Sequence, residues 1–294
     1  MNRRKLFRLK LNSRMLLLGD RTLVMGVLNV TPDSFSDGGK FLQPERAIEQ
    51  AFAIERAGAD LLDIGGESTR PGSVETPTSE ELDRILPVLE ALRGRLKIPI
   101  SVDTRRASVA EIALRAGAEL LNDVSGLKND PQIANVAARH GVPLILMHMR
   151  GEPRTMQLGG FARDAMRDVL QGLRKSVAAA LKAGVAKSQI ILDPGIGFGK
   201  SFAQSYEILQ RLPQLGELGY PLMVGTSRKG FLGATLARDG QPVPPEDRIW
   251  GTAATVTTSI LQGAHLVRVH DVEEMVQVAR VADCLVDPRR RPKT

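Results

Sequence analysis

Several residues that could do chemistry stand directly after short apolar runs. One is Asp193, which ends the run Ile190–Leu192 and precedes a glycine-rich stretch up to Lys200. Glycines ahead of Lys-Ser commonly cradle nucleotide phosphates through their backbone N–H groups. Here the first glycine of a Walker loop would fall on Pro194, which has no N–H, and Lys200 replaces the last glycine of the dinucleotide pattern. The spacing therefore excludes a nucleotide loop and leaves Asp193 as a carboxylate that holds a ligand.

Two further polar residues, Asp103 and Asn122, end other apolar runs. If these runs are parallel strands of one sheet, Asp103, Asn122 and Asp193 converge at one mouth and present acceptors and one amide. Such a set suits a flat, donor-rich heterocycle such as a guanidine-like pyrimidine edge. Taken alone, Asp103 could equally cap the helix that is predicted from Ala107.

Cationic and polar side chains follow the last two apolar runs. Arg268 and His270 are two residues apart on one predicted strand, so they point to the same side, and Ser227 and Lys229 follow the preceding run. In a (β/α)8 barrel the loops after these two strands are the usual phosphate site, so we predict a phosphate-bearing substrate. His270 could instead be a structural histidine. Asn29 could bind Mg²⁺ if substrate phosphates supply the other ligands.

Two long polar loops follow the first two predicted strands. The loop after Asn29 contains one aromatic residue, Phe35, which favours a lid that closes over a ligand, although a plain surface loop remains the alternative. The second loop, residues 63–72, is rich in glycine, and its Arg70 could bind an anion such as a carboxylate.

The elements that must position these residues are short apolar runs alternating with helical patterns. Runs in which apolar and polar residues do not alternate are typical of parallel strands that are covered on both faces. The predicted strands are Leu23–Leu28, Leu61–Ile64, Ile98–Val102, Leu120–Leu121, Val142–Met147, Ile190–Leu192, Leu222–Val224 and Leu266–Val269. The clearest predicted helices are Pro44–Ala57, Ser79–Leu92, Ala107–Ala116, Pro131–His140, Phe161–Ala183 and Val272–Leu285.

This alternation predicts an α/β fold, either a (β/α)8 TIM barrel or a doubly wound sheet. Polar residues follow nearly every run, and such a ring of groups favours the barrel, because an open sheet uses only its switch point. We expect a hairpin within residues 9–18 and an inserted helical piece around residues 239–247. The predicted single domain spans residues 15–286, between basic tails at 1–14 and 287–294.

Charge and composition exclude several classes of protein. The net charge of +7 belongs to the two tails, which carry ten basic residues and one acid, so we read their charge as solvated and expect no nucleic-acid partner. The single cysteine, Cys284, allows no internal disulfide and suits a reducing compartment. No apolar run approaches the roughly 20 residues of a membrane span. We therefore expect a cytoplasmic protein without a membrane partner.

The chain resembles the dihydropteroate synthase family in several stretches that occur in the family's order. The stretches are MGVLNVTPDSFSDGG (25–39), DIGGESTRPG (63–72), SVDT (101–104), NDVSG (122–126), MHMRG (147–151), DPGIGFGK (193–200), GTSRKGFLG (225–233) and RVHDV (268–272). Pterin-dependent methyltransferases share the barrel and the pterin site and remain the alternative enzyme. The TPDSFSDGG and STRPG loops resemble those of the synthase. A third possibility is nucleic-acid binding through the arginine-rich tails.

The resemblance implies condensation of 6-hydroxymethyl-7,8-dihydropterin pyrophosphate with p-aminobenzoate, which gives 7,8-dihydropteroate and pyrophosphate. It also implies Mg²⁺ as the cofactor, small-molecule substrates, a homodimer and sulfonamides as mimics of p-aminobenzoate that target the site. The site residues it implies fall into four groups. The pterin is held by Asp103, Asn122, Met147, Asp193 and Lys229; the pyrophosphate by Asn29, Asp63, Arg268 and His270, with the metal on Asn29; p-aminobenzoate by Phe35, Thr69, Arg70, Pro71, Phe198 and Ser227; and catalysis involves Asp37, Asp103 and Lys229.

Overall fold

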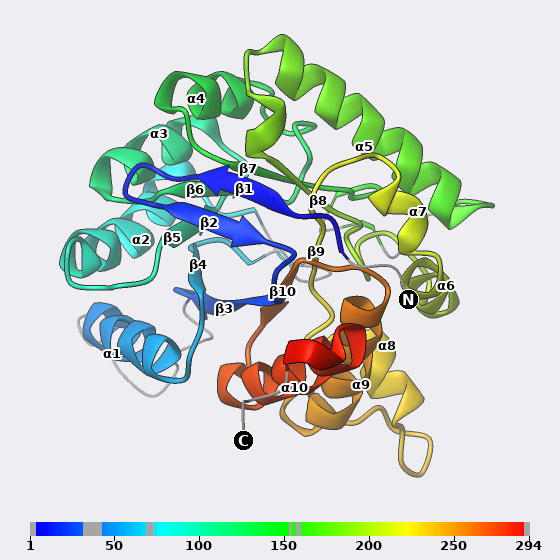
Figure 1. The fold of residues 1–294 in the computed structure, drawn as a ribbon. Helices are drawn as coiled ribbons and strands as arrows, with labels where there is room; N and C mark the ends of the chain where they lie inside the picture. Colours follow the sequence, from blue (N-terminus) through cyan, green and yellow to red (C-terminus); the bar gives the residue numbers. More distant parts are fainter. Residues whose placement is uncertain are drawn as a thin grey trace.

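The fold is built around eight parallel strands that form a barrel (Figure 1). A computed structural model describes residues 4–31, 43–68, 73, 75–152, 155–156 and 160–290. The barrel strands are β3 (Leu23–Asn29), β4 (Leu61–Gly65), β5 (Ile100–Asp103), β6 (Leu120–Asp123), β7 (Leu144–Met147), β8 (Ile190–Asp193), β9 (Met223–Val224) and β10 (Leu266–Val269). Their spatial order is β8-β7-β6-β5-β4-β3-β10-β9.

The two ends of this strand order meet each other, which nearly closes the sheet. A parallel bridge joins Leu192 of β8 to Leu222, just before β9, and the Leu192 N–H donates to Pro221 O at 3.0 Å. A doubly wound sheet would leave two open edges, so the closure confirms the prediction of a barrel.

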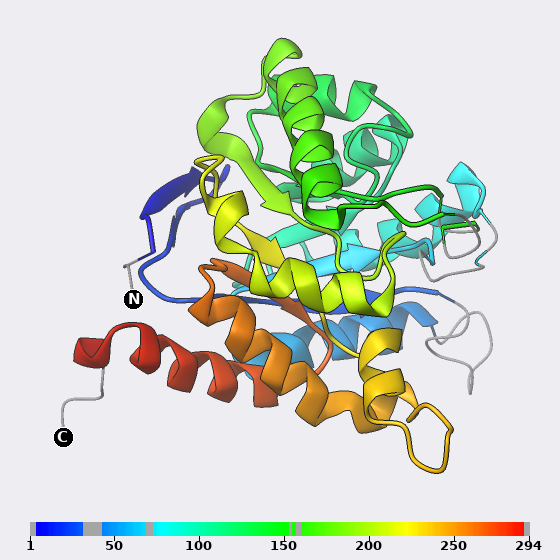
Figure 2. The same cartoon turned by 90° about the vertical axis from the view of Figure 1, so that its right-hand side faces the viewer.

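Helices surround the barrel on the outside, as Figures 1 and 2 show. They are α1 (Gln43–Arg56), α2 (Thr78–Leu92), α3 (Ala107–Ala116), α4 (Gln132–His140), α5 (Ala165–Lys182), α6 (Phe202–Gln210), α7 (Pro213–Gly216), α8 (Gly230–Thr235), α9 (Ile249–Leu261) and α10 (Val272–Val286), with 3-10 turns η2 (Lys187–Gln189), η3 (Pro245–Arg248) and η4 (Pro288–Arg290). Helix α5 begins later than predicted because the Asp164 side chain caps it, accepting from the Arg167 N–H at 3.0 Å.

The barrel interior changes from apolar to polar along the strands. Near their starts, inward side chains such as Ile145 and Ile191 form a buried cluster with Leu9 and Leu18 of a hairpin. The hairpin, β1 (Phe7–Lys10) paired with β2 (Met15–Leu18), lies at this end and confirms the prediction. Because side chains alternate along a strand, the next inward position after Ile191 is Asp193, at the opposite end of the barrel.

The described part of the N-terminal tail is folded rather than frayed. Arg4 is buried, donates to Thr22 Oγ1 at 2.6 Å and to Ala264 O at 2.8 Å, and forms an ion pair with Asp283 of α10. Lys5, Arg8, Lys10 and Arg14 are exposed, as the prediction of solvated charge requires, whereas the prediction is wrong for Arg4. A buried guanidinium needs such partners, and here they come from the residue before β3, the segment before β10 and the last helix.

The inserted piece after β9 lies between α8 and α9 and is exposed apart from Val243. Figure 2 shows this loop projecting beyond the helices around the barrel. Within the described residues, no helix is both long enough and apolar enough to cross a membrane.

Candidate active site

A narrow cavity lies at the C-terminal ends of the barrel strands. It is lined by Asp103, Asn122, Val124, Met147, Asp193, Phe198, Met223, Gly225, Ser227, Lys229, Arg268 and His270. The predicted pterin residues all line it, together with Phe198, Ser227, Arg268 and His270. Barrel enzymes place their chemistry at this end, because the loops that follow the strands are free to vary there.

Arg268 connects Asp103, which lines the cavity, to the fully buried Asp63. Its Nε donates to Asp63 Oδ2 at 2.6 Å and its Nη2 to Asp103 Oδ2 at 2.9 Å, while Asn122 Nδ2 also donates to Asp63 Oδ2 at 3.0 Å. Burial raises the pKa of Asp103 to about 8, opposed by the Arg268 charge and reinforced by the Asp63 carboxylate. Asp63 Oδ1 is buried without a hydrogen-bond partner among the described residues.

Asp193 and Lys229 both line the cavity, and each charge shifts the pKa of the other group. The Asp193 carboxylate accepts from the Gly195 N–H at 2.7 Å, and burial raises its pKa although the Lys229 charge opposes this. Lys229 Nζ donates to Ile196 O and lies 4.6 Å from the centroid of the Phe198 ring. Burial lowers the pKa of Lys229 to about 8, against the attraction of Asp193. The pair offers an acceptor and a donor on one side of the cavity.

A strained turn presents Ser227 and Lys229 to the same cavity. Between them, Arg228 adopts a left-handed conformation with φ of 58°, which is uncommon outside glycine. Its Nε donates to Asp271 at 3.1 Å, and its carbonyl accepts from Arg248 at 2.7 Å. On the cavity side, the Ser227 hydroxyl lies 3.0 Å from His270 Nδ1 and accepts from the His270 N–H at 3.1 Å. The sequence reasoning missed Arg228, although two predicted site residues flank it.

Asn29 ends β3 beside the carboxylates. Its Oδ1 and the Asp103 side chain both lie next to the Gly65 backbone, on the strand between them. Among the described residues no group of three or more His, Cys, Asp or Glu is arranged to hold a metal ion. The donor set at Asn29 therefore fits a hard cation only if a ligand supplies further oxygens.

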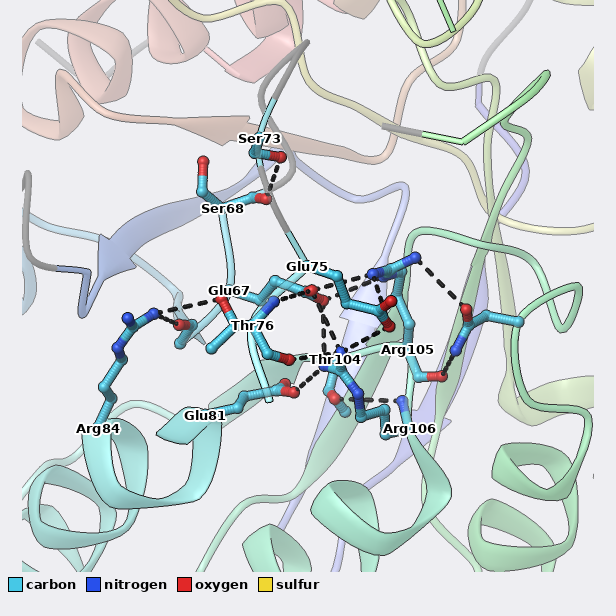
Figure 3. A network of polar contacts seen from close by, with 12 residues as sticks. Glu67, Ser68, Ser73, Glu75, Thr76, Glu81, Arg84, Thr104, Arg105 and Arg106 are labelled. Carbon is cyan, nitrogen blue, oxygen red and sulfur yellow. Dashed lines mark hydrogen bonds and ion pairs between the residues drawn. The ribbon is translucent and has the colours of Figure 1, made fainter. Parts of the chain in front are cut away.

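A network of salt bridges holds the described residues on either side of segment 69–72 (Figure 3). Arg105 and Arg106, after β5, both bind the Glu67 carboxylate, at N···O distances of 3.0 and 3.2 Å. Arg106 also donates to Thr76 O at 2.7 Å, and the Thr76 N–H donates to Glu67 at 3.1 Å. The sequence reasoning did not identify this network. Its residues lie next to predicted site positions, but nothing local predicts which carboxylate each arginine binds.

Five predicted site residues, Phe35, Asp37, Thr69, Arg70 and Pro71, lie outside the described residues. Their roles, like those of the residues that line the cavity, stay predictions.

A larger hollow of about 670 Å³ lies at the other end of the barrel, beside Phe7 and His265. It has no ring of strand-end polar groups, so we do not assign the chemistry to it.

The comparisons with known proteins agree with this geometry. The model of a family described as "Pterin binding enzyme" matches residues 25–270. Dihydropteroate synthase of Synechocystis sp. is 51% identical over 91% of both chains. The structure of Xanthomonas albilineans dihydropteroate synthase with 4-aminobenzoic acid has a TM-score of 0.89 and 41% identity, covering 96% of this chain and 99% of that one.

A third relative extends the comparison to a drug complex. The structure of Yersinia pestis dihydropteroate synthase with a sulfonamide has a TM-score of 0.87 and 42% identity, covering 95% of this chain and 98% of that one. High identity over nearly the full length, together with the barrel and its polar mouth, leads to one conclusion. The chain belongs to the family of pterin-binding enzymes, and within it to the dihydropteroate synthases.

Proposed function

We propose that this protein condenses 6-hydroxymethyl-7,8-dihydropterin pyrophosphate with p-aminobenzoate to give 7,8-dihydropteroate and pyrophosphate. The observation that carries the proposal is the convergence of Asp103, Asn122, Asp193 and Lys229 on one narrow cavity, with Arg268 and His270 beside them. The sequence predicts that these groups bind a flat, donor-rich ring that carries a phosphate. The activity named for the relatives needs a ring of this kind.

The pterin ring is assigned to the acceptor side of the cavity. Asp193 and Asp103 accept from the ring's N–H groups, Asn122 offers both a donor and an acceptor, and Lys229 donates. Met147 and Val124 lie in a small apolar cluster that Phe198 packs against, and this cluster covers the faces of a flat ring. Acceptors at the edges and apolar groups on the faces together select a heterocycle over a sugar.

The pyrophosphate is assigned to Arg268 and His270. Arg268 uses Nε and one Nη nitrogen on the two aspartates, so it keeps further N–H donors for an anion. In the reaction the bond between the pterin methylene and the pyrophosphate oxygen breaks, and the methylene becomes electron-poor. The nearby carboxylates stabilise that positive charge. The aniline nitrogen of p-aminobenzoate then forms the new bond to carbon and loses a proton.

Mg²⁺ is the cofactor we assign to the pyrophosphate side. Asn29 Oδ1 would hold it together with phosphate oxygens of the substrate. When bound, the ion would neutralise charge that builds up on the leaving pyrophosphate.

The test is pyrophosphate release by purified protein. We expect release only when the pterin pyrophosphate, p-aminobenzoate and Mg²⁺ are all present, and inhibition by a sulfonamide that competes with p-aminobenzoate. Absence of release with all three present would refute the proposal. Methyl transfer to a corrinoid, without consumption of p-aminobenzoate, would support the methyltransferase instead.

We also infer a homodimer in the cytoplasm. Helix α10 exposes two large apolar side chains one turn apart, Val281 at 66% and Leu285 at 57% of their surface. This apolar face is the surface that we assign to contact with a second subunit. The single cysteine suits a reducing compartment.

A further inference from the structure

Two buried polar side chains behind the cavity have no part in the proposed chemistry. Lys200 and His148 expose only 3% and 4% of their surface. Lysine is almost never buried to this extent unless its ammonium group is paired, because removing the charge from water is costly. Lys200 belongs to the glycine-rich stretch that resembles a phosphate loop in the sequence, so its position needs another explanation.

The Lys200 ammonium group binds three acceptors and no anion. Nζ lies 2.9 Å from Phe198 O, 3.1 Å from His148 O and 3.1 Å from His148 Nδ1. An ammonium has three donors and no acceptor, so each of its N–H groups has one of these three acceptors. Nδ1 must then be unprotonated, which places the ring hydrogen on Nε2, 3.6 Å from Asp168 Oδ2 on α5. The ring rests on Gly172 of α5, where a Cβ would collide with it.

The turn from Pro194 to Gly199 needs such an anchor. Gly195 and Gly199 have φ values of 65° and 64°, and a Cβ on either would collide with a carbonyl of the segment that follows β7. Glycine permits this close approach but is also the residue with the most freedom to lose on folding. Lys200 bonds the turn at Phe198 O and the β7 side at His148, so it joins the two backbones.

This turn also positions two side chains that line the cavity. Ile196 O accepts from Lys229 Nζ, and the Phe198 ring lies against the same ammonium. We propose that Lys200, together with His148, is a positioning residue that holds the Pro194–Gly199 turn so that Phe198 and Lys229 are placed for the pterin ring. The effect on pterin binding rests on the proposed function, whereas the effect on the turn does not.

The charges around the pair add a pH dependence. Burial lowers the pKa of Lys200 to about 7; Lys229 and Lys128 act in the same direction, and Asp193 and Asp168 oppose them. Burial also lowers the pKa of His148 to about 2, helped by Lys200, Lys128 and Arg150, so this ring stays neutral. Above pH 7 the Lys200 amine keeps two donors for three acceptors. The bonds from Lys200 to the turn and to His148 are then weaker, because the positive charge and one donor are gone.

The first experiment compares Lys200→Met with Lys182→Met, the same change at an exposed lysine on α5. Hydrogen exchange of the amides of residues 195–199 is measured in both full-length variants and the wild type, without ligand. We expect at least tenfold faster exchange in Lys200→Met and no change in the control. Equal exchange in a folded Lys200→Met variant would overturn the proposal.

The second experiment measures the affinity for 6-hydroxymethylpterin by calorimetry between pH 6 and 8. We expect Lys200→Met to bind at least tenfold more weakly at pH 6. Lys200→Arg, which keeps the charge and the donors, should recover part of the affinity and show a smaller change in affinity between pH 6 and 8 than the wild type. If Lys200→Met does not fold, Lys200→Arg decides the question: because Lys229 and Asp103 titrate in both proteins, identical pH profiles for the wild type and Lys200→Arg contradict the proposal.

The two proposals fail in different ways. A wild type that neither binds the pterin nor releases pyrophosphate would refute the function, while the exchange measurement would still decide whether Lys200 holds the turn. A wild type that binds the pterin, with an equally tight Lys200→Met variant, would refute the positioning role alone.

Discussion

At the scale of single residues, the surroundings of each charged side chain determine its pKa and which of its atoms can bind a ligand. Asp193 is buried, accepts one backbone N–H and has three cationic neighbours, Lys229, Arg268 and Lys200. Its second oxygen is the acceptor we assign to the pterin. Because the strand and the turn after it fix the carboxylate, its chemistry can be changed without changing the shape of the site.

Asp193→Asn tests that assignment. The amide replaces a charged acceptor by a group that presents N–H donors to the donors of the ring, so we expect pterin affinity to fall at least about 100-fold, or roughly 3 kcal/mol. Calorimetry with 6-hydroxymethylpterin measures the affinity, and circular dichroism shows whether the fold is kept. Asp247→Asn, at an exposed position, is the control. Unchanged affinity in the Asp193 variant would refute the assignment.

At the scale of elements, backbone contacts between neighbouring loops position the side chains. The Pro194–Gly199 turn approaches the end of β7 so closely that only glycine fits at Gly199, beside Arg150 O. Glycine at Gly141 has nearly the same backbone, with φ of 63° against 64°, but nothing within 4 Å of an added Cβ. An alanine at Gly141 would therefore suffer only from the left-handed backbone, whereas an alanine at Gly199 would also collide with the neighbouring segment.

Gly141→Ala should therefore cost about 1 kcal/mol in the free energy of unfolding, from the left-handed backbone alone. Gly199→Ala should cost roughly 2–4 kcal/mol, because the turn or β7 must also move. Urea denaturation measures both values, and only Gly199→Ala should also weaken pterin binding. Equal costs for the two variants would show that the turn relaxes freely.

A buried histidine that titrates joins the start of the chain to the segments that lead into β9 and β10. His265 Nδ1 accepts from the Leu222 N–H at 3.1 Å, so its Nε2 carries the hydrogen and donates to Lys5 O at 3.1 Å. Burial lowers the pKa of His265 to about 4; the Lys5 carbonyl opposes this and the Arg4 charge adds to it. The unfolded chain takes up this proton near pH 6.5, whereas the folded chain resists it until pH 4.

The stability contributed by the neutral ring is therefore present above pH 6.5 and is lost as the pH falls to 4, by up to about 3 kcal/mol. His265→Gln can keep both hydrogen bonds but does not titrate. We expect the free energy of unfolding to fall less steeply between pH 6.5 and 4 in this variant than in the wild type. His148, also buried and neutral, contributes equally to both proteins and cancels in the comparison. Parallel pH profiles would contradict the account.

At the scale of the whole molecule, segments from both ends of the chain pack against the barrel. The hairpin covers one mouth, and the Arg4–Asp283 ion pair fastens the chain start to α10. The outer face of α10 remains exposed at Val281 and Leu285. A dimer formed through this face would leave the opposite, polar mouth of the barrel open to substrate.

The double variant Val281→Glu and Leu285→Glu tests the dimer. Both side chains are exposed, so the fold should be kept, whereas two charges in an apolar interface should separate the subunits. Light scattering should give the mass of a dimer for the wild type and for Gln277→Glu on the same helix, and the mass of a monomer for the double variant. A monomeric wild type, or a double variant that stays dimeric, would refute the inferred interface.

The sequence by itself was enough to predict the barrel, its hairpin, and the polar strand-end residues that line the cavity, but not its apolar residues Val124 and Met223. Those features follow local rules: apolar runs form strands, side chains alternate along them, and parallel strands end on one side. Asp193 and Arg268 could be assigned to the mouth because each is a strand position.

Only the tertiary structure decided which groups those side chains meet. Arg4 was predicted to be solvated, yet it binds Asp283, 279 residues away. Lys200 turns from the cavity to His148, and Glu67 binds two arginines after another strand. No local pattern encodes such contacts, because they arise when distant segments pack and each buried charge must find a partner.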